Sequence, residues 1–75
     1  MIPLALLKDG EEGTVAEIAR GRRACTRLQE IGIVKGKKIR VLRNSGSLLV
    51  SMNGTKFVLG RGLAMKVIVD DGKEV

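Results

Sequence analysis

Residues 22–38, RRACTRLQEIGIVKGKK, contain the one convincing helical pattern in the chain. Ala24, Leu28 and Ile31 recur at spacings of four and three residues, which places them on one face of an α-helix. Gly32 follows the last of them, where a left-handed helix cap favours a residue without a Cβ atom. A helix of about two to three turns is too short to be stable alone, so we expect this apolar face to pack on a sheet.

The rest of the chain is typical of short strands separated by glycine-containing turns. We predict strands at residues 14–19, 38–44, 47–52, 55–59 and 65–69. Asn53-Gly54 is the strongest hairpin signal, because a type I′ turn requires positive φ at both positions. Val15 and Ile18 are three residues apart, so a bulge near residues 16–17 is needed for both to face inward.

The chain ends carry weaker signals. Leu4 and Leu7 are expected to pack either as one turn or as a strand leading into the domain. Residues 8–10 predict a turn, and residues 11–13 predict a second polar corner. Residues 70–75 are polar and are expected to form a frayed tail.

About five strands, with one short helix after the first of them, predict a mainly β protein: a single domain over residues 1–75, folded as a small, partly open β-barrel. Its predicted core is aliphatic and comprises Leu4, Leu7, Val15, Ile18, Leu28, Ile31, Ile39, Val41, Leu48, Val50, Phe57, Leu59, Val67 and Val69.

Composition argues against several kinds of site. With one Cys and no His, the chain lacks the usual nitrogen ligand for zinc and transition metals, and no Ser/His/Asp or Cys/His catalytic set can be assembled. We therefore predict no enzyme activity, no cofactor and no metal site, and we expect Cys25 to be a small buried apolar residue. The carboxylates of Asp9, Glu11 and Glu12 could hold a hard cation loosely, but a solvated corner is the preferred interpretation.

The apolar runs are too short to span a bilayer, and the N-terminus lacks the pattern of a signal peptide. A single Cys suits a reducing compartment. We therefore expect a cytoplasmic protein.

Positive charge is concentrated in one segment. Residues 20–43 contain nine basic residues against the single acid Glu30, whereas residues 1–19 are net acidic. Such a segment attracts acidic partners, nucleic acid or anionic lipid headgroups, and the alternative is a solvated surface that keeps the protein soluble. Arg22 and Arg23 are unfavourable beside the positive end of the helix dipole. They either serve a role outside the fold or are simply solvated, and solvation is the preferred interpretation.

The order of residues resembles the FeoA family, the small cytosolic partners of bacterial and archaeal ferrous-iron uptake. The most specific part is RLQEIGI at residues 27–33, followed by Gly36, Ile39 and Val41. Further matches extend the resemblance from Met1 to about Asp70: Leu4, Leu7, Gly10, residues 13–15, Ile18, residues 48–50, Gly54, residues 57–60, Ala64 and residues 67–69. The family often has Pro where this chain has Lys35.

The resemblance implies an SH3-like barrel and a non-enzymatic role in iron transport. It also implies association with the cytoplasmic part of the membrane GTPase permease FeoB, which would recruit the chain to the inner face of the membrane. For such docking we predict a basic set and an apolar set: Arg22, Arg23, Arg27, Lys35, Lys37 and Lys38, with Leu49, Val58 and Leu63. The strand pleat directs Leu49 and Val58 away from the core, although packing inside the fold is the alternative for all three apolar residues.

Other functions stay open. The positive charge suits nucleic acid, but Phe57 is the only aromatic ring, and single-strand binding depends on stacking platforms. The same absence of Trp and Tyr argues against binding of proline-rich peptides. The barrel also occurs as the C-terminal domain of metal-dependent repressors, and an edge strand of an open barrel could pair two copies into a homodimer.

Overall fold

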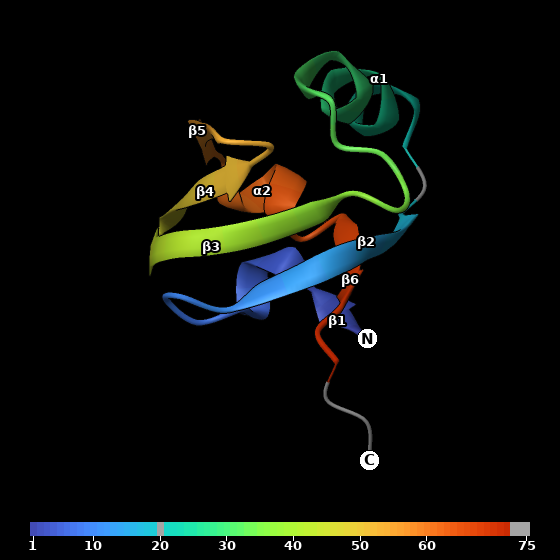
Figure 1. The fold of residues 1–75 in the computed structure, drawn as a ribbon. Helices are drawn as coiled ribbons and strands as arrows, with labels where there is room; N and C mark the ends of the chain where they lie inside the picture. Colours follow the sequence, from blue (N-terminus) through green and yellow to red (C-terminus); the bar gives the residue numbers. More distant parts are fainter. Residues whose placement is uncertain (20, 73–75) are drawn as a thin grey trace.

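The computed structural model describes residues 1–19 and 21–72. Within these residues, six antiparallel strands form one sheet that curls into a partly open barrel (Figure 1). The strands are β1 (Ile2–Pro3), β2 (Glu12–Ile18), β3 (Lys38–Ser45), β4 (Ser47–Met52), β5 (Thr55–Leu59) and β6 (Val67–Asp70). Two α-helices, α1 (Arg22–Ile31) and α2 (Arg61–Ala64), and a 3₁₀ turn, η1 (Leu4–Leu6), complete the described fold.

The sheet order β1-β6-β2-β3-β4-β5 places the last strand between the first two. β6 pairs with β1 through Ile2–Val69 and with β2 through Val15–Val69. The two strands approach closely at Gly13, where a Cβ atom would lie only 3.0 Å from the carbonyl oxygen of Asp70 and 3.0 Å from the Cβ of Val69. Glycine at position 13 therefore suits this close packing of β2 and β6, since a Cβ atom would force β6 to shift by a few tenths of an ångström.

The mainly β, partly open barrel is confirmed, and the strands predicted at residues 47–52 and 55–59 match β4 and β5. Asn53 has φ 53° and Gly54 has φ 79°, as the predicted type I′ hairpin turn requires. The predicted bulge in β2 is also present, between Val15 and Glu17.

Several predicted boundaries are wrong. Residues 11–13 do not form a polar corner, because β2 already begins at Glu12 and pairs with β3 there. The sequence predicted no separate strand at residues 2–3, where the structure has β1. The helix α1 therefore follows the second strand of the chain and not the first. A second bulge, in β3 between Val41 and Arg43, was not predicted either. Asp70 ends β6, and residues 73–75 of the predicted tail lie outside the described residues.

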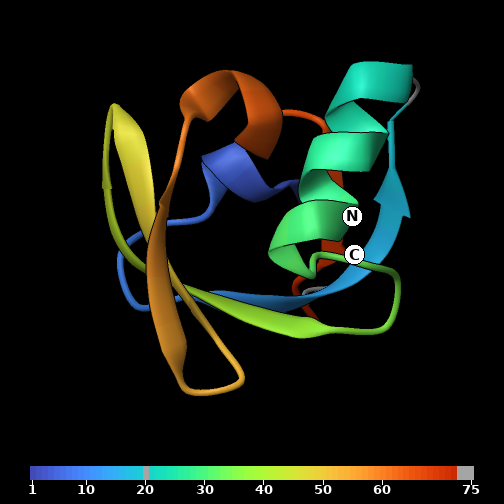
Figure 2. The same cartoon turned by 90° about the horizontal axis from the view of Figure 1, so that it is seen from above.

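The helix α1 lies over one end of the barrel (Figure 2). It ends as its sequence predicts, because Gly32 adopts φ 98° and its N–H donates to the carbonyl oxygens of Leu28 and Gln29. The N–H of Ile33 also donates to the carbonyl of Leu28, at 2.9 Å. Leu28 is fully buried and Ile31 is half-buried, so the apolar face packs on the barrel. No described helix is long and apolar enough to cross a membrane.

The predicted core residues all belong to the buried cluster or pack against it. Ile18, Ile31 and Phe57 are only partly buried. The cluster also contains Ala5, Ile33, Met52 and Ala64.

A polar network around Asn44 joins the N-terminal turn to β3 and α2. The side-chain amide of Asn44 donates to the carbonyl oxygens of Ala5 and Leu7, each at 2.8 Å. Its side-chain oxygen accepts a hydrogen bond from Arg61, and its backbone N–H donates to Asp9. One amide thus holds segments more than 35 residues apart in sequence.

Replacement of Asn44 by alanine should lower the free energy of unfolding by about 2 kcal/mol, because the carbonyl of Leu7 loses its side-chain donor and that of Ala5 keeps only Arg61, at 3.4 Å. Urea unfolding measures the change. Ser45→Ala, on an exposed neighbouring position of β3, is the control and should change stability by less than about 0.5 kcal/mol. Equal effects of the two substitutions would contradict a structural role for the amide.

Two glycines provide a second test. Gly32→Ala should destabilise by about 1–2 kcal/mol, because φ 98° is costly for a residue with a Cβ atom. Gly62→Ala, in α2, has no atom within 4 Å of the added Cβ and no positive φ, so it should stabilise by roughly 0.5–1 kcal/mol. Thermal unfolding of both variants compares them, and a destabilised Gly62→Ala would show that α2 requires glycine there.

Candidate docking groove

A groove of about 650 Å³ lies between the start of α1 and the segment formed by α2 and the residues before β6. We call it the α1–α2 groove, and its lining residues are Gly21, Arg22, Arg23, Ala24, Arg27, Leu63 and Lys66. Ala24 is buried and Leu63 is half-buried against the core, so together they form an apolar floor.

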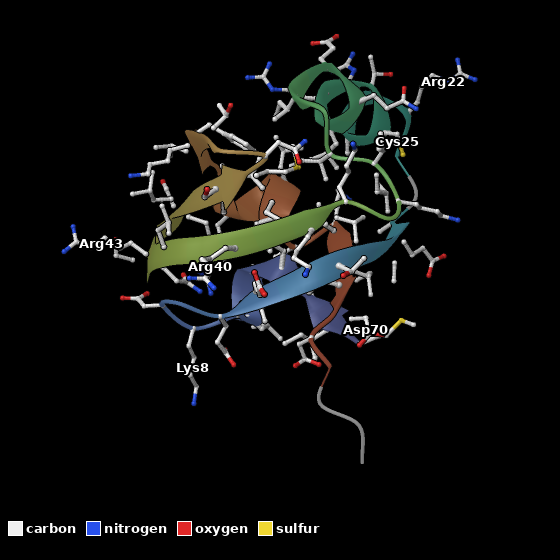
Figure 3. All side chains as sticks on the ribbon, viewed as in Figure 1. Lys8, Arg22, Cys25, Arg40, Arg43 and Asp70 are labelled. Atoms are coloured by element: carbon white, nitrogen blue, oxygen red, sulfur yellow. The ribbon has the colours of Figure 1, made fainter. Side chains whose placement is uncertain are left out.

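Every charged residue in the described lining of this groove is basic: Arg22, Arg23, Arg27 and Lys66. The side chains of these four form no hydrogen bond or ion pair with another described residue. Arg40 and Arg61 differ, because Arg40 lies 3.7 Å from Glu12 and Arg61 donates to Asn44. Figure 3 shows Arg22 extending outward from the start of α1. The cations around the groove are therefore available to a ligand or partner.

The structure brings four of the predicted docking residues together in this groove, namely Arg22, Arg23, Arg27 and Leu63. The predicted lysines lie elsewhere. Lys35 borders a hollow with Cys25, Lys37 borders one beside Phe57, and Lys38 lies next to Arg40.

The other two predicted apolar residues lie on the outer face of the sheet. Leu49 and Val58 are cross-strand neighbours in β4 and β5, as the predicted pleat requires. Val58 is 67 % exposed, whereas Leu49 is half-buried. On β3, Arg43 is the cross-strand partner of Leu49, and it lies at the end of the molecule away from Arg22 (Figure 3). The predicted residues thus fall on separate surfaces, of which the α1–α2 groove gathers the largest number of them.

Lys66 was missed by the sequence prediction, because it lies outside the basic segment at residues 20–43. Its backbone N–H donates to the carbonyl of Leu63, at 3.0 Å, in the turn that follows α2. This turn holds Leu63 and Lys66 on the same side of the groove. In the sequence, only the spacing of three residues between Leu63 and Lys66 could have indicated that they lie on the same side.

The acidic residues near the N-terminus are engaged within the fold. Asp9 accepts a hydrogen bond from the backbone of Asn44, Glu11 accepts one from the backbone of Lys8, and Glu12 lies near Arg40. Among the described residues, no group of three or more His, Cys, Asp or Glu could hold a metal ion.

Cys25, expected to be buried, is half-buried. Its Sγ lies 3.7 Å from the carbonyl oxygen of Ala19, which anchors the inner side of α1 to the end of β2.

The arginines at the start of α1 should cost stability. Arg23→Glu should raise the free energy of unfolding by about 0.3–1 kcal/mol, because an acid is favourable at the positive end of the helix dipole. The control Arg43→Glu makes the same change in net charge on β3, far from the dipole, and should have a smaller effect. Chemical denaturation at low salt compares the two, and destabilisation by Arg23→Glu would reveal a structural contact of Arg23.

Comparisons with known proteins show which family the chain resembles. The family model described as "FeoA domain" matches residues 2–71. The chain is 45 % identical over 74 residues to "Putative Fe(2+) transport protein A" of Methanocaldococcus jannaschii, covering 97 % of this chain and 90 % of that protein.

Solved structures share the fold. A crystal structure of an iron uptake regulatory protein (FeoA) superimposes with a TM-score of 0.86 at 35 % identity, covering 92 % of this chain and 93 % of the other. FeoA of Stenotrophomonas maltophilia, described as a prokaryotic SH3 domain protein complexed with zinc, gives 0.83 at 26 % identity, with 96 % and 93 % covered. A manganese-dependent transcriptional repressor gives 0.85 at 27 % identity over 92 % of this chain, which spans 40 % of the repressor. The barrel is thus SH3-like, and the chain belongs to the FeoA family.

Proposed function

We propose that this chain is a non-enzymatic accessory module of ferrous-iron uptake, and that it docks through the α1–α2 groove on the cytoplasmic part of a FeoB-type GTPase permease. Family membership and the name of the M. jannaschii relative support the link to Fe²⁺ transport. In this proposal the chain is cytoplasmic and reaches the inner face of the membrane by binding its partner.

The choice of this groove as the docking surface is supported by its combination of an apolar floor with cations that have no described ion-pair partner. Protein interfaces concentrate their binding energy in a desolvated apolar centre, and charges at the rim set orientation and association rate. Ala24 and Leu63 provide the centre, and the basic residues of the groove provide the rim. Because the side chains of those cations form no ion pair with a described residue, binding a partner does not require such a pair to break.

The chemistry of the groove supports binding over catalysis. Guanidinium and ammonium groups donate hydrogen bonds but accept none, so the described charged groups of the groove include no general base. An arginine of the groove could complement negative charge on the partner's nucleotide site, but the same residue would serve equally as a docking contact.

Titration of the cytoplasmic region of a FeoB permease tests the proposal. Binding should be saturable and should weaken as salt is raised from about 0.05 to 0.2 M, because exposed charges are screened over shorter distances. Arg27→Glu should weaken binding by about tenfold or more, equivalent to about 1.4 kcal/mol. The control Arg43→Glu, which alters net charge equally outside the groove, should change it by less than about threefold, as expected for an exposed charge remote from the interface.

A parallel titration with duplex DNA separates this function from the repressor-like alternative. Absence of permease binding together with salt-sensitive DNA binding would overturn the proposed function. Equal weakening by Arg27→Glu and Arg43→Glu would retain the partner but reject the groove as the docking surface.

A further inference from the structure

We propose that the α1–α2 groove receives an acidic amphipathic helix of the partner protein, in which an aliphatic side chain shares one face with two carboxylates one helical turn apart. This inference rests on the proposed function, since it names the chemistry of the segment that docks.

The cations of α1 have a helical spacing. Arg23 and Arg27 both line the groove and are separated by four residues, so they lie one turn apart, about 6 Å along the helix axis. A second helix lying alongside α1 presents carboxylates at the same interval when it carries acids at positions i and i+4. Lys66 lines the groove from the segment before β6, so a carboxylate on the other edge of that helix also has a basic partner.

The floor determines what lies between the acids. Ala24 is small and only 8 % exposed, and Leu63 packs against the core behind it. A polar side chain placed over this floor would lose its hydration without gaining a described hydrogen-bonding partner, because the polar side chains of the lining stand at the rim. An aliphatic side chain instead removes apolar surface from water on both partners.

Phosphate-bearing ligands fit this arrangement less well. A headgroup or nucleic-acid backbone engages cations but leaves an apolar floor unused. The outer face of α1 carries Glu30 beside Arg22, Arg23 and Arg27, and this acid interrupts the array of cations that a flat anionic membrane would meet. Phe57, the one ring able to stack on a base, borders a different hollow with Ile31 and Met52. A helix of protein uses both the charge and the floor.

Carboxylates also suit the donors present. Arginine offers a planar fork that binds a carboxylate through two parallel hydrogen bonds, and such charge-assisted pairs are stronger than neutral ones. Arg22, Arg23 and Arg27 are exposed and have no described partner that would compete for those donors.

A synthetic 18-residue helical peptide tests the inference. It carries two Glu residues four positions apart and a Leu three positions after the first of them, so that all three side chains share one face. Two matched peptides replace either those Glu residues by Gln or the Leu by Ser. Titration into the ¹⁵N-labelled full chain should shift the backbone amides of residues 21–27 and 63–66, with little change at β3. Each matched peptide should bind about tenfold more weakly or worse, as the loss of a central contact predicts.

Variants of the chain provide the matched controls. Arg27→Gln and Arg23→Gln should each weaken the acidic peptide by about three- to tenfold, and Arg43→Gln, which removes the same charge from β3, by less than about twofold. These residues are exposed and unpaired, so their variants should fold normally. Equal binding of the Leu and Ser peptides, or equal effects of Arg27→Gln and Arg43→Gln, would overturn the inference, since either result indicates attraction by net charge alone.

Competition separates this inference from the proposed function. If the permease region binds but the acidic peptide does not displace it, the docking function stands and the inference is wrong. If the peptide binds in the groove but the permease region does not bind, the groove chemistry is supported and the proposed partner is wrong. Stronger shifts of the groove amides with phosphatidylglycerol vesicles or duplex DNA than with the peptide would also overturn the inference.

Discussion

The pairing of β6 with both β1 and β2 is the contact on which the rest of this fold depends. It joins the two ends of the described chain in one sheet and brings Val67 and Val69 into the core. Gly13 favours its close geometry, because a Cβ atom there would lie 3.0 Å from Val69 and Asp70 and β6 would have to shift slightly to accept it. The groove depends on the same pairing, since Leu63 and Lys66 lie in the short segment that leads into β6. A fault in the register of the last strand would therefore displace one wall of the groove as well as part of the core.

The other wall of the groove is α1, which is anchored less firmly to the rest of the fold. α1 is inserted between β2 and β3, and its fully buried side chain is Leu28, supported by Ala24 and the partly buried Ile31. The cap at Gly32 fixes where the helix ends, but its start has no side-chain cap and no acid in the first turn. The helix thus carries its positive charge at the end where the dipole opposes it. Such an unfavourable arrangement is expected where the residues serve in binding, because natural proteins violate local conformational preferences mainly at functional sites.

Much of the fold follows from short-range patterns. The helix, its glycine cap, the Asn53-Gly54 hairpin and the β2 bulge were predictable because each depends on a few neighbouring residues with distinct conformational needs. The strand β1 was not predictable. Its two residues, which begin at Ile2, are too few to show an alternating pattern, and they pair only with β6, which is distant in sequence. The Asn44 network also depends on segments far apart in sequence. The same limit applies to the site: the arginines of α1 were found from charge, whereas their meeting with Lys66 depends on topology.

The strands that carry the two chain ends lie side by side, with Ile2 opposite Val69, at the side of the molecule away from α1 (Figure 1). A domain built this way has separate faces for attachment and for recognition. Another polypeptide joined before β1 or after β6 leaves the helix and its groove uncovered. This geometry gives a physical reason why the same barrel serves as almost the whole of one protein and as 40 % of a repressor: it is a unit that extra domains extend without blocking.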